Sequence, residues 1–142
     1  MKSYIFHYRK EKTKEGEVVY RPVAYVHLKG RDRNWYLFDP YIDSGADLCL
    51  FTRSDCNLLG YELKEGRERL IAGVSGALIR TYIHQILLRI GEIELIAEVA
   101  FAELEEVPRL LGRKDIFNRF QINFDEDELK IYFTPKEKGE VY

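Results

Sequence analysis

The segment FDPYIDSGADLCLF, residues 38–51, carries a carboxylate between two apolar runs that have the character of buried strands. Asp43 ends the first run and is followed at once by Ser44 and Gly45. An ionised carboxylate in such a place is costly unless it is paired, hydrogen-bonded or open to solvent. Gly45 permits a tight, otherwise forbidden turn, and the Ser44 hydroxyl both donates and accepts hydrogen bonds. The pattern therefore indicates a carboxylate held at a strand end, where it suits a general base acting on water.

The same triplet is also compatible with an ordinary turn. Asp, Ser and Gly are all favoured in turns, and most Asp-Ser-Gly triplets have no other role. On this interpretation the chain is a generic β-barrel in which Asp43 does no chemistry. The triplet alone leaves both interpretations open, so the elements around it have to decide.

Strand patterns dominate the rest of the chain. Apolar residues occupy alternate positions in three segments: Val18, Tyr20, Ala24, Val26 and Leu28; Ile93, Leu95, Ala97, Val99 and Phe101; and Leu129, Ile131 and Phe133. A period of two over such lengths predicts half-buried strands. Turn sequences at 14–16, 29–32, 90–92 and 125–127 separate them. Closely spaced strands joined by such turns predict an all-β, antiparallel fold, as a sandwich or barrel.

Two short segments are predicted to be helical. Ser54 is a candidate N-cap for a helix over residues 55–59, with Gly60 as its C-terminal stop. The second segment spans residues 114–120, where three apolar residues share one helical face: Ile116, Phe117 and Phe120.

We expect the chain to form one domain. Residues 1–16 are predicted to be an N-terminal extension or hairpin, residues 17–134 the domain itself, and residues 135–142 a charged C-terminal tail. The sequence contains no internal repeat, low-complexity tract or linker that would divide it further.

In this context the sequence resembles the retroviral-type aspartic proteases, the retropepsins, from Arg21 to about Phe124. Residues 43–47, Asp-Ser-Gly-Ala-Asp, are similar to the Asp-Thr/Ser-Gly-Ala-Asp signature of that family. Residues 71–76, Ile-Ala-Gly-Val-Ser-Gly, resemble the tip of the flap hairpin that closes over substrate, although the family tip is often richer in glycine. Residues 110–113, Leu-Leu-Gly-Arg, are similar to the apolar-apolar-Gly-Arg segment near the end of the family fold.

The resemblance implies a fold and a set of site residues. The expected fold is an all-β acid-protease barrel with a flap hairpin and one or two short helices, one lobe per chain. The resemblance assigns catalytic roles to Asp43, Ser44 and Gly45. It also implies an ion pair between Asp47 and Arg113 that supports the active-site loop. Substrate contacts are expected from Ala46, Asp47, Ala72, Gly73, Val74, Ser75 and Gly76.

Aspartic protease chemistry needs two carboxylates around one water molecule. The chain carries a single Asp-Ser/Thr-Gly triplet, at residues 43–45. The economical interpretation is a symmetric homodimer that hydrolyses peptide bonds in a polypeptide substrate, with one Asp43 from each chain. The alternative is a non-catalytic peptide-binding or dimerisation module on the same fold, since an intact motif does not prove turnover.

Composition and charge argue against several other classes. The formal net charge of −2 and the pI near 6.0 give no reason to expect nucleic-acid binding. No segment approaches the roughly 18 apolar residues of a transmembrane helix, and the first residues are too polar for a signal peptide. We therefore expect a cytoplasmic protein without membrane contact. Cys49 and Cys56 do not make a disulfide framework or a metal site, and we expect neither metal nor cofactor.

Overall fold

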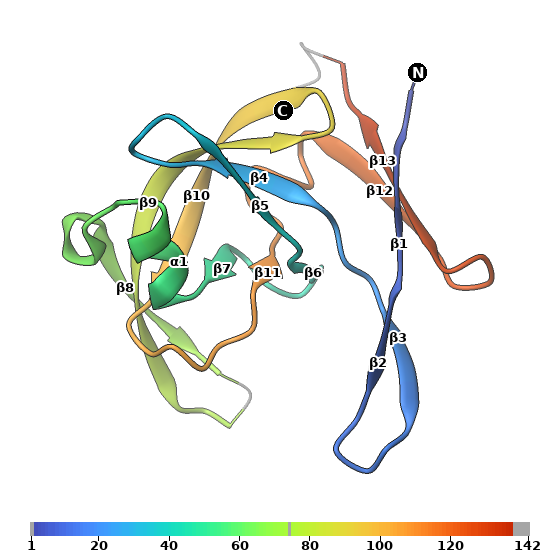
Figure 1. The fold of residues 1–142 in the computed structure, drawn as a ribbon, viewed down its shortest axis with the longest axis horizontal. Coiled ribbons are helices and arrows are strands. Elements are labelled where there is room, and N and C mark those ends of the chain that lie inside the picture. The colour runs from blue at the N-terminus through green and yellow to red at the C-terminus, as the bar shows by residue number, and fades with distance from the viewer. Residues whose placement is uncertain (1, 74, 138–142) are drawn as a thin grey trace.

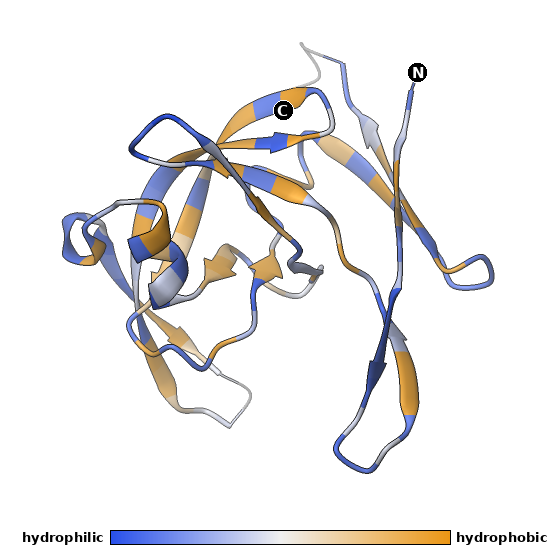
Figure 2. Cartoon of the chain, viewed as in Figure 1, coloured by the Kyte–Doolittle hydropathy of each residue, from blue (hydrophilic) through white to orange (hydrophobic). Residues whose placement is uncertain are grey.

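The computed structural model describes residues 2–73 and 75–137, and β-strands dominate it. The longest two, β9 (Leu78–Ile90) and β10 (Ile93–Ala102), form an antiparallel hairpin. Apolar and polar residues alternate along both strands, as Figure 2 shows, so one face of the pair packs into the core. The period-two pattern in the sequence thus predicted β10 correctly.

A curled sheet of eight strands forms the body of the protein (Figure 1). Its strands follow the order β5-β4-β9-β10-β7-β11-β6, and β8 pairs with the first half of β9. The shorter strands are β4 (Val26–Lys29), β5 (Trp35–Phe38), β6 (Tyr41–Ile42), β7 (Cys49–Phe51), β8 (Arg67–Ala72) and β11 (Leu110–Leu111). The last strands in this order, β7, β11 and β6, flank the segment that contains Asp43.

A second sheet contains three strands in the order β1-β13-β12. β13 (Lys130–Pro135) lies between β1 (Tyr4–His7) and β12 (Phe120–Asp125), so strands from both ends of the chain are paired. Phe6 packs edge-on against Phe133, with ring centroids 5.3 Å apart. Both rings belong to the same apolar core as the curled sheet, which joins the two sheets into one unit.

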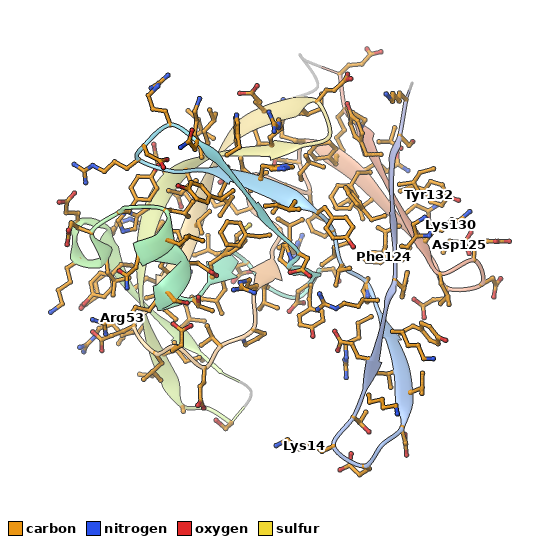
Figure 3. The ribbon with its side chains drawn as sticks, in the orientation of Figure 1. Lys14, Arg53, Phe124, Asp125, Lys130 and Tyr132 are labelled. Carbon is orange, nitrogen blue, oxygen red and sulfur yellow. The ribbon has the colours of Figure 1, made fainter. Side chains whose placement is uncertain are left out.

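The N-terminal segment also forms a hairpin that projects from the body (Figure 1). β2 (Arg9–Lys12) and β3 (Val18–Arg21) pair on either side of a turn, where Lys14 is labelled in Figure 3. The expected domain boundary at residue 16 falls inside this hairpin, and the division of the chain stays a prediction. The alternating pattern that begins at Val18 is broken after β3, because Pro22 has no N–H to donate to a ladder.

One of the two expected helices is present. α1 (Arg53–Leu58) has Thr52 rather than Ser54 as its N-cap. Thr52 and Asp55 exchange side chain to backbone hydrogen bonds at 3.1 Å, which makes a capping box. Gly60, with a φ of +83°, follows the helix and ends it as expected. A 3-10 turn, η1 (Leu63–Glu65), comes next. Within residues 2–73 and 75–137, no helix is long and apolar enough to span a membrane.

The helix expected over residues 114–120 does not form. Residues 113–119 make a series of turns, in which the Phe120 N–H donates to the Ile116 carbonyl oxygen at 3.0 Å. Asp115 has a φ of +69°, which interrupts the right-handed helical path. Its carboxylate accepts a hydrogen bond from the Glu98 N–H at 2.9 Å, so contact with β10 outweighs the local helical pattern.

Candidate active site

Asp43 lies half-buried in the loop that follows β6. β11 runs between β6 and β7, parallel to the first and antiparallel to the second. The Asp43 N–H donates to the Leu111 carbonyl oxygen at 3.0 Å, which continues the ladder between β6 and β11. The Asp43 carboxylate accepts a hydrogen bond from the Gly45 N–H, with 2.9 Å between Oδ1 and the nitrogen. The sheet and the loop therefore fix the direction of this side chain.

Two glycines near Asp43 are required by close contacts. A Cβ atom at Gly45 would lie 3.3 Å from Asp43 Oδ1. A Cβ atom at Gly112 would lie 2.2 Å from the Leu48 carbonyl oxygen, a distance that real Cβ atoms do not adopt. Neither glycine has the positive φ that Gly76 has, so space rather than a left-handed conformation explains the tight turn at Gly45.

The segments that contain Asp47 and Arg113 are joined through their backbones. The Arg113 N–H donates to the Ala46 carbonyl oxygen, and the Lys114 N–H donates to the Asp47 carbonyl oxygen, each at 2.9 Å. The side chains of Asp47 and Arg113 line one open cavity of about 650 Å³, together with Arg69 of β8. Among the side chains that the structure describes, no salt bridge joins Asp47 to Arg113, so the expected ion pair stays a prediction.

The expected flap segment is the end of the hairpin formed by β8 and β9. The two strands pair as far as Ala72 and Leu78. The Gly76 N–H donates to the Gly73 carbonyl oxygen at 2.9 Å, and Gly76 has a φ of +83°. Val74, one of the expected substrate contacts, lies outside the described residues. The hairpin end projects beyond the curled sheet (Figure 1), and its role as a lid stays a prediction.

An ion pair that the sequence analysis missed fixes the strand next to Asp43. Arg109 directly precedes β11, and its guanidinium donates two hydrogen bonds to the Asp55 carboxylate, at 2.7 and 3.0 Å. The side chain of Asp55 is 4% exposed and that of Arg109 is 41% exposed. The hydrogen bond with Asp55 raises the pKa of Arg109. The spacing Thr52-x-x-Asp55, a capping box after an apolar run, is the sequence signal that identifies Asp55.

A second network ties the N-terminal hairpin to the strand before Asp43. Glu11 of β2 accepts a hydrogen bond from the Tyr41 hydroxyl at 2.7 Å and forms salt bridges with Arg9 and Arg21 at 2.9 and 3.1 Å. Arg9 also pairs with Asp39 at 2.5 Å. Burial acts to raise the pKa of Glu11, but the hydrogen bonds from Tyr41 and Arg9 outweigh it, so the net pKa is lowered. Residues before the start of the resemblance thus help to hold β6.

The structure offers no support for metal or thiol chemistry. In the described part of the chain, no group of three or more His, Cys, Asp or Glu side chains is placed to hold a metal ion. Cys49 and Cys56 are free and buried. Burial raises the pKa of Cys49 to about 12 and that of Cys56 to about 11. Neither thiol is therefore suited to act as a nucleophile at neutral pH.

Comparison with known proteins identifies the fold. No protein-family model and no curated protein matches this sequence. Among solved structures, the chain is similar to the EIAV protease in complex with the inhibitor HBY-793, with a TM-score of 0.54 and 23% sequence identity. The similarity covers 69% of this chain and 86% of the EIAV protease chain. The chain therefore has the all-β, retropepsin-like fold expected from its sequence, with one lobe per chain.

The structure brings part of the expected site together. Residues 43–47 form one loop, and Arg113 lies beside it through the backbone bonds described above. Ala72, Gly73, Ser75 and Gly76 belong to a separate segment, the hairpin end, which is exposed or half-buried. The catalytic and substrate-binding roles of both segments stay predictions. The supporting carboxylates of Glu11 and Asp55 were missed, because their partners lie far away in the sequence.

Proposed function

We propose that this chain is one half of an aspartic endopeptidase that acts as a symmetric homodimer. The observation that carries the proposal is the half-buried Asp43, whose carboxylate is oriented by the Gly45 N–H at 2.9 Å. The backbone bond from Asp43 to Leu111 holds the same residue against the sheet. A retropepsin-like fold with one lobe supplies one such carboxylate, so a second copy of the chain completes the pair.

In the proposed mechanism, the two Asp43 carboxylates hold one water molecule between them. Like charges at close range disfavour double ionisation, so one carboxyl group carries a proton and the other is ionised. The ionised group takes a proton from the water as the water oxygen bonds to the scissile carbonyl carbon. The protonated group donates its proton to the carbonyl oxygen. The tetrahedral intermediate then breaks at its C–N bond as the nitrogen accepts a proton.

The proposed substrate is an extended polypeptide between the Asp43 loop and the end of the β8–β9 hairpin. Extended peptides bind largely through backbone hydrogen bonds, with side-chain pockets adding specificity. Residues 46–47 and 72–76 are the chain segments assigned to these contacts. Closure of the hairpin over the peptide excludes water and completes the site.

Cleavage of an unfolded protein tests the proposal. Wild type and the Asp43→Asn variant are incubated with an unfolded protein between about pH 4 and 7, and samples are separated on a gel. We expect fragments from the wild type only, and inhibition by a statine-type mimic of the transition state. Circular dichroism of Asp43→Asn checks that the variant is folded. Equal cleavage by both proteins would remove Asp43 from the mechanism, and binding without fragments would favour the peptide-binding module.

A further inference from the structure

The three-stranded sheet has a free edge at β12. β12 pairs with β13 on one side, and within residues 2–73 and 75–137 no strand pairs with its other side. An exposed edge strand is a template for pairing with another chain unless Pro, Lys or a bulge blunts it. The sequence of β12 is FQINFD, which contains neither Pro nor Lys, and its register with β13 is continuous. This edge is therefore open to a further strand.

Alternate residues of β12 direct their backbone groups toward the free edge. The Lys136 N–H donates to the Arg119 carbonyl oxygen at 2.9 Å, which sets the phase of the ladder with β13. Opposed residues in an antiparallel ladder alternate between hydrogen-bonded and non-bonded pairs. Counted from this bond, Ile122 and Phe124 point their N–H and C=O groups away from β13. The part of the chain that the structure describes supplies no backbone partner for these four groups.

The side chains of the same two residues are incompletely covered. Ile122 and Phe124 pack against the apolar core, but both remain partly exposed because the sheet ends at β12. Figure 3 labels Phe124 at this hairpin. A strand added to the edge would cover both side chains while it satisfies their backbone groups.

We propose that two copies of this chain join along β12, antiparallel, about a two-fold axis that passes beside Asn123. In this register Ile122 exchanges backbone hydrogen bonds with the partner's Phe124, and the symmetry-related pair does the same. Asn123 faces the partner's Asn123, and Gln121 faces the partner's Asp125, so no like charges are opposed. The dimer then contains one continuous sheet with three strands from each copy.

The position of β12 connects this interface to the site. The Lys114 N–H donates to the Asp47 carbonyl oxygen, and the turns over 113–119 lead from there directly into β12. The choice of partner rests on the proposed function, since the Asp43 site is incomplete without a second copy. The other edge, β1, is shorter and runs through Tyr8 into the projecting hairpin. We therefore assign the interface to β12.

A cysteine beside the proposed axis tests this register. Opposed residues of a non-bonded antiparallel pair have Cα atoms about 4.5 Å apart, which a disulfide can bridge. Asn123→Cys is expected to give a disulfide-linked dimer on a non-reducing gel after mild oxidation. Gln121→Cys is the matched control on the same face of β12, and its thiol would lie about 14 Å from its own copy. The native thiols of Cys49 and Cys56 are buried.

Ile122→Pro provides a second test that does not depend on a new thiol. The Ile122 N–H points away from β13, so proline at this edge position leaves the ladder with β13 in place. The loss of one backbone hydrogen bond from each copy is expected to weaken dimerisation at least about tenfold in sedimentation. The far-UV circular dichroism spectrum should not change. A dimer of unchanged affinity would count against the interface.

The results separate this interface from the proposed function, because cross-linking does not require hydrolysis. A cross-linked Asn123→Cys dimer without peptidase activity would support the interface and remove the proposed function. An active enzyme whose Asn123→Cys variant forms no disulfide would overturn the interface and leave the function standing. Equal cross-linking of Gln121→Cys would also overturn the proposed register.

Discussion

The α-carbon of Gly112 faces the carbonyl oxygen of Leu48 so closely that a Cβ atom would lie 2.2 Å from that oxygen. Gly112→Ala is therefore expected to push the Asp43 loop away from β11, at a cost of about 1–3 kcal/mol in the free energy of unfolding. Chemical denaturation measures this cost. Gly73→Ala is the matched control, because its Cβ atom would meet nothing closer than 3.5 Å. A Gly112→Ala protein as stable as Gly73→Ala would show that the contact is unimportant.

The buried carboxylate of Asp55 depends on Arg109. Arg109→Met leaves a side chain that is 4% exposed without its cation. Breaking a buried pair typically costs about 3–5 kcal/mol, and we expect about 2 kcal/mol here because Arg109 is partly exposed. The double variant Asp55→Asn/Arg109→Met removes the uncompensated charge as well. Thermal and urea unfolding should find the double variant more stable than Arg109→Met, and the opposite order would refute this account of the pair.

The salt bridge between Glu98 and Lys114 predicts a pH dependence of stability. The hydrogen bond from Lys114, 2.8 Å long, lowers the pKa of Glu98 from its usual value of 4.5. A lowered folded-state pKa stabilises the protein above the unfolded-state pKa, and this contribution is lost as the pH falls through the folded-state value. The wild type should therefore exceed Glu98→Gln in unfolding free energy at neutral pH, and the difference should disappear in acid.

Urea unfolding at a series of pH values checks this prediction. Glu94→Gln, on the same face of β10, is the control, since Glu94 is exposed and forms no salt bridge among the described residues. The Glu94→Gln protein should follow the wild type at every pH. A difference between wild type and Glu98→Gln that stays constant into acid would exclude the ionised carboxylate as its source.

The turn at Gly76 allows the proposed lid to be tested separately from overall stability. Gly76 and Gly16 both lie in hairpin turns, with φ values of +83° and +87°, and a Cβ atom at either position would meet no other atom within 4 Å. Alanine strains the backbone by about 1 kcal/mol at either position. If the β8–β9 hairpin closes over substrate, Gly76→Ala should lower kcat/KM about tenfold, whereas Gly16→Ala should not. Equal kcat/KM values for the two variants would argue against the lid.

Sequence patterns predicted the features that depend on neighbouring residues. The alternation over residues 93–101 indicated β10, and the Gly60 stop indicated the end of α1. The apolar run before Asp43 correctly placed this residue at the end of a strand. Such signals work because side-chain period and turn preference act over a few residues.

Features that depend on contacts distant in sequence were not predictable in the same way. The pairing of β1 with β13 joins the two ends of the chain, and Asp55 meets Arg109 across 54 positions. No local spacing connects such partners. The helix expected over 114–120 was wrong for a related reason, because Asp115 adopts a positive φ and binds the Glu98 N–H instead.

The central claim is that one site needs an Asp43 from each of two chains, and mixed dimers test it most directly. Wild-type and Asp43→Asn chains are unfolded together, refolded as mixtures and assayed for peptide cleavage at constant total protein. If both carboxylates are required, activity falls with the square of the wild-type fraction, to about one quarter in an equal mixture. A linear fall, to about one half, would mean that each chain acts through its own Asp43 alone, and would contradict the claim.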